Sequence, residues 1–130
     1  MKTIADNECY TILVDSTKNR LYLTIIGFWG NRSVVPNYLG DLIKAVGELS
    51  KDFTILTDVT QMKAPPADVG ALHAEAQKVL VDAGLKKTAE VVGQDVITKM
   101  AVDRLSRESG MNKGTFGNKK EAEAWLDEKE

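Results

Sequence analysis

The stretch that most constrains the fold is a β-rich segment that leads through a polar loop and a proline pair into a helix. Residues 53–59 (Phe-Thr-Ile-Leu-Thr-Asp-Val) are mostly apolar or β-branched, which predicts a buried strand. The loop that follows contains Pro65 and Pro66, and helical apolar spacing begins after them. In an α/β sheet, ligands usually bind at the loops that leave the carboxyl ends of strands. Residues 60–72 contain no serine, cysteine or histidine, so this loop lacks a nucleophile of those types.

Hydrophobic periodicity predicts the other elements. The predicted strands are 9–16, 20–28, 53–59, 88–93 and a short segment near 115–116. The predicted helices are 36–49, 66–83, 95–109 and 118–128. Gly84 is placed to end the second helix, and Asn118 with Glu121 has the spacing of a capping box.

Each predicted helix has one apolar stripe and therefore needs only one covered side. We expect an α/β fold in the order ββαβαβαβα, with a mixed four- or five-stranded sheet and about four helices packed mainly on one face. The length of 130 residues suits a single domain over 1–130, with frayed ends at 1–8 and 127–130.

Composition argues against several broad classes of function. With 17 Lys and Arg against 19 Asp and Glu, the net charge is −2, so we expect no general attraction to nucleic acid. The single cysteine, Cys9, cannot form a disulfide within the chain, which favours the reducing cytoplasm. No apolar run approaches the roughly 18 residues that span a bilayer, so we expect no stable membrane insertion.

Residue types that serve catalysis or bind metals are scarce. The chain has one histidine and one cysteine without the clustered spacing of zinc sites, so we expect no metal and no cofactor. His73 lies beside the apolar stripe of its helix, which indicates a boundary histidine at the core edge rather than a catalytic base. Cys9 is typical of a small buried hydrophobe. We therefore expect no enzymatic activity, although carboxylate or lysine chemistry stays open.

Two loops carry the candidate partner or ligand surface. Gly27 and Gly30 bracket Phe28 and Trp29, which we interpret as exposed or half-exposed aromatics that either bind a partner or cover a neighbouring element. In the second loop, the proline pair stiffens the chain. The predicted surface consists of Phe28, Trp29, Asp58, Thr60, Lys63, Pro65, Pro66 and Asp68.

Residues 86–120 hold a local surplus of positive charge, with eight basic side chains against four acidic ones. One interpretation is that these charges belong to ordinary solvated faces of helices and a loop. The other is a surface that attracts an anion or an acidic partner. The segment lacks the interleaved aromatic residues that would favour nucleic acid.

Three features together resemble the STAS domain family. A strand ends in Asp58-Val59-Thr60, a helix begins near Gly70-Ala71-Leu72, and the element order is that of the family. The tail 114–126 (Gly-Thr-Phe-Gly-Asn-Lys-Lys-Glu-Ala-Glu-Ala-Trp-Leu) is similar to the single-domain SpoIIAA-like, or STAS/SEC14-like, branch. The resemblance extends from about Tyr10 to Leu126.

The resemblance lacks the family's regulatory serine. Anti-sigma-factor antagonists of this family have an Asp-Ser-Ser-Gly-Leu-type motif in the strand-to-helix loop, where phosphorylation of a serine switches partner binding. Pro65-Pro66-Ala67 occupies the corresponding place in this chain. Asp68 supplies a negative charge nearby, which either mimics a permanently modified state or interacts favourably with the helix dipole.

The resemblance implies a regulatory or protein-interaction domain that acts on an unknown protein partner and self-associates as a homodimer. The alternative is a carrier of a small apolar ligand or lipid, similar to SEC14-like proteins. This alternative predicts an apolar cavity between the strand that holds Ile55 and the helix face from Val69 to Leu80. An enzyme is the third hypothesis.

Overall fold

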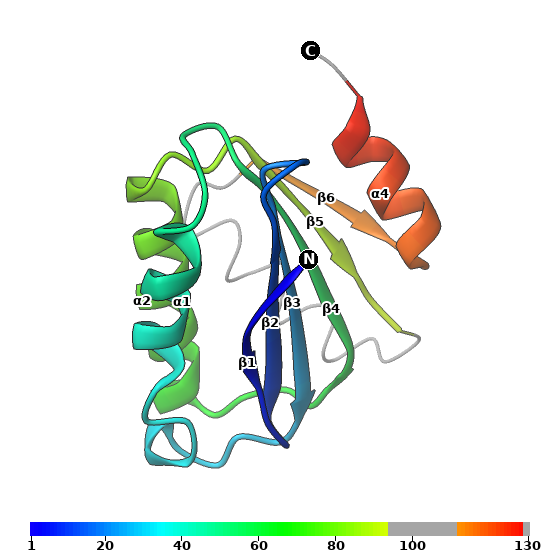
Figure 1. Ribbon diagram of the computed structural model, residues 1–130. Coiled ribbons are helices and arrows are strands. Elements are labelled where there is room, and N and C mark those ends of the chain that lie inside the picture. Colours follow the sequence, from blue (N-terminus) through cyan, green and yellow to red (C-terminus); the bar gives the residue numbers. More distant parts are fainter. Residues whose placement is uncertain (94–111, 129–130) are drawn as a thin grey trace.

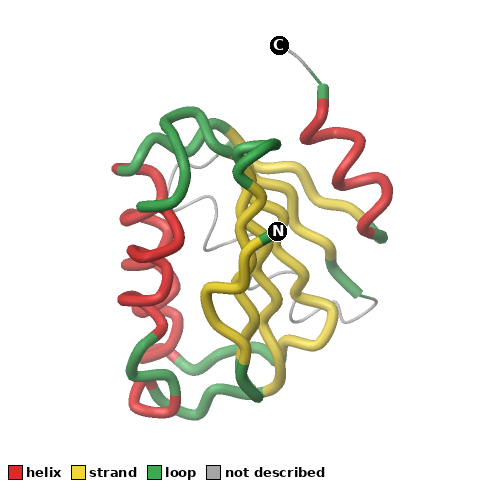
Figure 2. Tube along the Cα trace, in the orientation of Figure 1, coloured by secondary structure: helices red, strands yellow, loops and turns green. Residues whose placement is uncertain are grey.

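The computed structural model describes residues 1–93 and 112–128, which form a six-stranded sheet with helices on both faces (Figures 1 and 2). The strands are β1 (Lys2–Asp6), β2 (Tyr10–Asp15), β3 (Arg20–Gly27), β4 (Thr54–Met62), β5 (Lys87–Val91) and β6 (Lys113–Phe116). The helices are the 3₁₀ turn η1 (Arg32–Val34), α1 (Tyr38–Val46), α2 (Ala67–Asp82) and α4 (Lys119–Asp127). The helix expected at 95–109 lies outside the described residues.

The sheet is mixed, as predicted. Its strands lie in the sequence order β1 to β6, where β1, β2 and β3 pair antiparallel and β3 to β6 pair parallel. The tight turn between β2 and β3 is set by the Asp15 carboxylate, which accepts hydrogen bonds from the backbone amides of Thr17 and Lys18 at 3.0 and 3.2 Å. Asn19 follows in the left-handed conformation, with φ of 54°. The parallel pairs β3–β4 and β4–β5 are joined by crossovers that contain α1 and α2, since parallel neighbours need a long connection.

The sheet has six strands rather than four or five, because the first residues form a strand. The segment expected to fray contains β1, which pairs with β2 through partners such as Lys2 with Val14. An edge strand has only one neighbour, and β1 is mostly exposed, so it lacks the alternation of buried side chains that signals a strand.

Two of the three described α-helices share one face of the sheet, and the third lies on the other face. Helices α1 and α2 cover one face of the sheet, whereas α4 packs on the opposite face over β4, β5 and β6 (Figure 1). Strand β4 supplies both cores: Ile55 points toward α1 and α2, and Leu56 packs in a second core with Ala122 and Leu126 of α4. All five residues of β5 are buried: Ala89 and Val91 pack in the core under α4, and Thr88 and Glu90 point to the side of α2.

Candidate functional site

The loops that follow β3 and β4 lie side by side at one end of the sheet (Figure 1). Gly27 pairs with Met62 at the ends of these strands, and the amide of Lys63 donates a hydrogen bond to the Gly27 carbonyl at 3.0 Å. Gly27 has a φ of 77°, a conformation that side chains disfavour, and it turns the chain out of β3. Phe28 follows directly and is 60% exposed.

Trp29 was expected to be exposed or half-exposed with Phe28, but it is buried. Its indole nitrogen donates a hydrogen bond to the Ile26 carbonyl at 3.1 Å, and only 3% of the residue is exposed. The ring stacks on His73 at 5.3 Å between centroids and meets Tyr38 edge-on at 5.0 Å. Trp29 therefore belongs to the core, and Phe28 is the aromatic residue of this loop that faces solvent.

The proline loop is tied to the Phe28 loop by Asp68. Pro66 is the extended residue that precedes α2, and its side chain makes no capping hydrogen bond. The Asp68 carboxylate accepts a hydrogen bond from the backbone amide of Arg32 at 2.9 Å, and the Arg32 guanidinium pairs with Glu75 of α2 at 2.7 Å. Lys63 and Asp68 are both exposed. These contacts fix both loops against the start of α2.

Asp58 and Thr60 lie away from this surface, on the α4 side of β4. The Asp58 carboxylate accepts hydrogen bonds from the amide and hydroxyl of Thr60 at 2.9 and 2.6 Å, and it pairs with Lys119 of α4 at 3.3 Å. Burial alone would raise the pKa of Asp58, but these hydrogen bonds and the Lys119 charge outweigh burial and lower it. Because Asp58 is only 7% exposed, it is placed to hold α4 rather than to meet a partner.

The structure thus separates the eight predicted surface residues into three places. The end-loop surface is defined here as Phe28, Lys63, Pro65, Pro66 and Asp68, which lie in or next to the two adjacent loops. Asp58 and Thr60 lie under or beside α4, and Trp29 is in the core.

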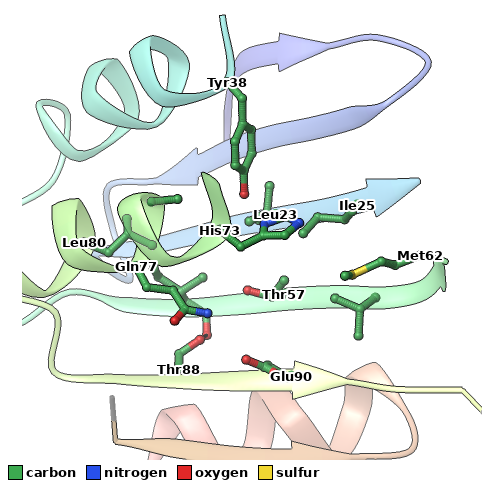
Figure 3. Close-up of a pocket in the computed structure, with 13 residues that line it drawn as sticks. Leu23, Ile25, Tyr38, Thr57, Met62, His73, Gln77, Leu80, Thr88 and Glu90 are labelled. Carbon is green, nitrogen blue, oxygen red and sulfur yellow. Dashed lines mark hydrogen bonds between the residues drawn. The ribbon is translucent and has the colours of Figure 1, made fainter. Parts of the chain in front are cut away.

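A small pocket lies between α2 and the strands β3, β4 and β5 (Figure 3). Its volume is about 50 Å³, and Leu23, Ile55 and Leu80 form part of its apolar wall. This is the location that the carrier hypothesis predicts for an apolar cavity. The wall is not uniformly apolar, since it also contains the polar side chains of Thr57, His73, Gln77, Thr88 and Glu90.

His73 is a core residue rather than the boundary residue expected from the helical wheel. It is 6% exposed, because Trp29 and Tyr38 cover its ring. Burial lowers the pKa of His73 from 6.5 to about 4, so the imidazole is neutral at pH 7. Gln77 lies one helical turn after His73 and points toward the same space (Figure 3). This spacing of four residues is the sequence signal that could have joined the two polar side chains.

No helix within residues 1–93 and 112–128 is long and apolar enough to cross a membrane. Within the same residues, His, Cys, Asp and Glu side chains form no group of three or more that could hold a metal ion.

Comparisons with known proteins identify the fold but give no function. No protein-family model matches this chain, and no curated protein does either. Among solved structures, the chain is similar to an uncharacterised protein of the DUF3478 family from Shewanella loihica PV-4, which has a SpoIIAA-like fold. The two are 14% identical in sequence, with a TM-score of 0.61, and the similarity covers 94% of this chain and 97% of the other.

Proposed function

We propose that this chain, whose fold is SpoIIAA-like, is a non-enzymatic regulatory domain of the cytoplasm that acts by binding another protein through the end-loop surface. The observation that carries the proposal is the exposure of Phe28 beside a stiff, tethered loop. The fold neighbour and the STAS resemblance support an interaction domain. The absence of a serine from residues 60–72 supports binding without the family's phosphorylation switch.

The end-loop surface is suited to docking because its components are already ordered. Proline restricts the unfolded and flexible states of a loop, and the Asp68 contact to Arg32 holds the two loops together. A preorganised surface loses less conformational entropy when it binds. Burial of a phenylalanine side chain contributes about 1.5–3 kcal/mol, so Phe28 can supply a substantial part of the binding energy of a small interface.

The chemistry of the surface defines the partner. Phe28 requires an apolar recess on the other protein, while Lys63 and Asp68 present opposite charges at its border. A partner with an apolar recess and charges of both signs at its rim fits this arrangement. A second copy of this chain is one such partner, so self-association is part of the test.

The test compares Phe28→Ala with Ile43→Ala, a matched change at an exposed apolar residue of α1 that is 55% exposed. We expect Phe28→Ala to weaken partner binding by about tenfold or more, from the lost burial energy. Ile43→Ala should leave binding unchanged, and neither change should alter the melting temperature. Binding is measured by affinity capture with mass spectrometry of the partner and, for self-association, by sedimentation velocity.

Lys63→Glu gives a second, independent test of the same surface. Reversal of this charge should lower the association rate constant by a larger factor than it raises the dissociation rate constant. Charges at the border of an interface act mainly on the diffusional encounter of the two proteins. The proposal is wrong if both Phe28→Ala and Lys63→Glu bind the partner as well as the unaltered protein does. It is also wrong if binding is lost only in proportion to a loss of thermal stability, because these residues would then serve the fold alone.

The size of the pocket argues against the carrier hypothesis in this conformation. An engineered apolar cavity that binds benzene has a volume of about 150 Å³. The pocket of this protein, at about 50 Å³, is a third of that volume and is partly polar. A lipid chain would require α2 to move away from the sheet. Native mass spectrometry of protein purified from cells checks this: a bound lipid would overturn the preference for an interaction domain.

A further inference from the structure

Among the residues that the structure describes, the pocket between α2 and the sheet contains a buried polar atom without a hydrogen-bond partner. The side-chain oxygen Oε1 of Gln77 is buried without a hydrogen-bond partner. The His73 imidazole is more than nine-tenths buried and lines the same pocket, one helical turn before Gln77 on α2. A buried polar group without a partner costs free energy, so it persists where something else completes the bond.

We propose that this pocket is a binding site for a small uncharged molecule of the primary-amide class, which donates a hydrogen bond to Gln77 and exchanges one with His73. This inference does not depend on the proposed interaction through the end-loop surface, because the pocket lies between α2 and the sheet rather than in the loops.

The volume of the pocket sets the size of the ligand. One water requires roughly 10–15 Å³ of such space, so about 50 Å³ holds roughly three to five waters or a molecule with about four non-hydrogen atoms. Acetamide has this size. Figure 3 shows Gln77 and His73 extending from α2 toward the sheet, where Thr57 of β4 and Thr88 of β5 lie.

The hydrogen-bonding groups set the chemistry of the ligand. Gln77 Oε1 requires a donor. A neutral imidazole has one nitrogen that donates and one that accepts, so His73 can satisfy either end of an amide. A primary amide carries an N–H donor and a carbonyl acceptor on the same carbon, which matches two neighbouring protein groups of this kind.

The charges of the described residues that line the pocket disfavour an anion of the same shape. Neither lysine nor arginine occurs among the described residues that line it, whereas Glu90 contributes a carboxyl group. His73 is neutral at pH 7. These lining residues therefore offer an acetate ion no neutralising cation in a low-dielectric space, which is unfavourable.

The test uses His73 as the reporter, because it is the single histidine of the chain. Acetamide and acetate are titrated separately into the full-length protein at pH 7, and the imidazole resonances are followed by NMR. We expect a saturable shift with acetamide at a Kd no tighter than about 0.04 mM, the limit for four non-hydrogen atoms. Acetate should bind at least about tenfold more weakly, since it lacks the donor and carries a charge.

Two variants assign the site. Gln77→Leu removes the buried acceptor and should weaken acetamide binding by about tenfold. Gln61→Leu makes the same change at an exposed position of β4 and should leave the affinity unchanged. Saturable binding of acetamide that is equal in Gln77→Leu would overturn the proposal. Equal affinities of the unaltered protein for acetate and acetamide would overturn it as well. A His73 resonance that does not respond to acetamide would also overturn it, because the pocket would then hold water alone.

Discussion

The imidazole of His73 lies in an aromatic environment that water scarcely reaches. Trp29 stacks on it, and Tyr38 meets it edge-on at 6.0 Å. Burial disfavours the charged form of the ring and so lowers its pKa to about 4. Because His73 has a lower pKa in the folded than in the unfolded chain, the free energy of unfolding depends on pH through this residue.

Acidification should destabilise the protein through His73. Between pH 6.5 and about 4 the unfolded chain binds a proton at His73 that the folded chain does not, so stability falls as the pH falls through this range. The loss should reach about 2 kcal/mol at pH 5 relative to pH 7.5, and below the folded pKa this residue adds no further loss.

Urea unfolding at pH 7.5 and pH 5 measures this effect. His73→Phe, which has no titrating group, should lose the His73 part of the pH dependence while the carboxylates contribute as before. An identical fall in stability for the variant and the unaltered protein would mean that His73 is not the group responsible.

Helix α4 is held on the sheet largely by polar contacts. Asn118 begins it, since the asparagine side chain accepts a hydrogen bond from the Glu121 amide at 2.9 Å. Lys87 of β5, which is 2% exposed, caps the C-terminal end of the helix. Its ammonium donates hydrogen bonds to the carbonyls of Trp125 and Glu128 at 2.8 and 3.2 Å. The same ammonium lies 4.6 Å from the centre of the Trp125 ring.

Arg20 adds a second cation beneath the same helix. Its guanidinium pairs with Glu123 and, at 3.0 Å, with Asp127, while its Nε donates to the Thr54 hydroxyl at 2.9 Å. The apolar residues that α4 buries are few, namely Ala122 and Leu126. The position of α4 therefore depends on buried cations near its C-terminal carbonyls, where they also interact favourably with the helix dipole.

Lys87→Met should loosen α4 specifically. Methionine retains the apolar stem but leaves the terminal carbonyls of the helix without their donor, at a cost of about 1–3 kcal/mol. Hydrogen exchange measured by mass spectrometry should show faster exchange in residues 119–128 and little change in α2. Lys78→Met, at a residue whose side chain is 77% exposed, is the matched control. Unchanged exchange in α4 would show that its apolar contacts suffice.

The whole molecule has two cores that share one sheet. The core under α1 and α2 contains Trp29, and the smaller core under α4 has Trp125 packed against it. Adjacent residues of β4 enter opposite cores, since Ile55 and Leu56 are 1% and 3% exposed on the two faces. A shared central strand couples the cores, so we expect them to unfold as one unit.

Ile55→Ala and Leu56→Ala should each lower the free energy of unfolding by about 2–5 kcal/mol, as large-to-small changes in a core do. Trp29 fluorescence in a Trp125→Phe background and Trp125 fluorescence in a Trp29→Phe background report the two cores separately. Each alanine variant should show the same shift in urea midpoint with both reporters. A loss confined to the reporter of one core would mean that the two faces unfold independently.

Local patterns in the sequence determined most elements and several of their ends. The alternation of Tyr10, Ile12 and Val14 gave β2, and the apolar stripes gave α1, α2 and α4 within three residues at each end. The predicted cap at Asn118 is confirmed by its hydrogen bond. The predicted helix end at Gly84 is consistent with its φ of 103°, which L side chains rarely adopt. These features depend on neighbours within a few residues, so a single sequence contains them.

Tertiary structure alone decided which faces these elements cover. An apolar stripe shows that α4 must pack on something, but the side of the sheet depends on how the chain crosses over before β6. The same holds for Phe28 and Trp29, adjacent residues of which one is exposed and one is buried against His73. It holds also for the pocket, which Thr57 and Gln77 both line although they are twenty residues apart in the sequence. Spacing fixes directions within one element, whereas contacts between elements arise only when the sheet brings distant segments together.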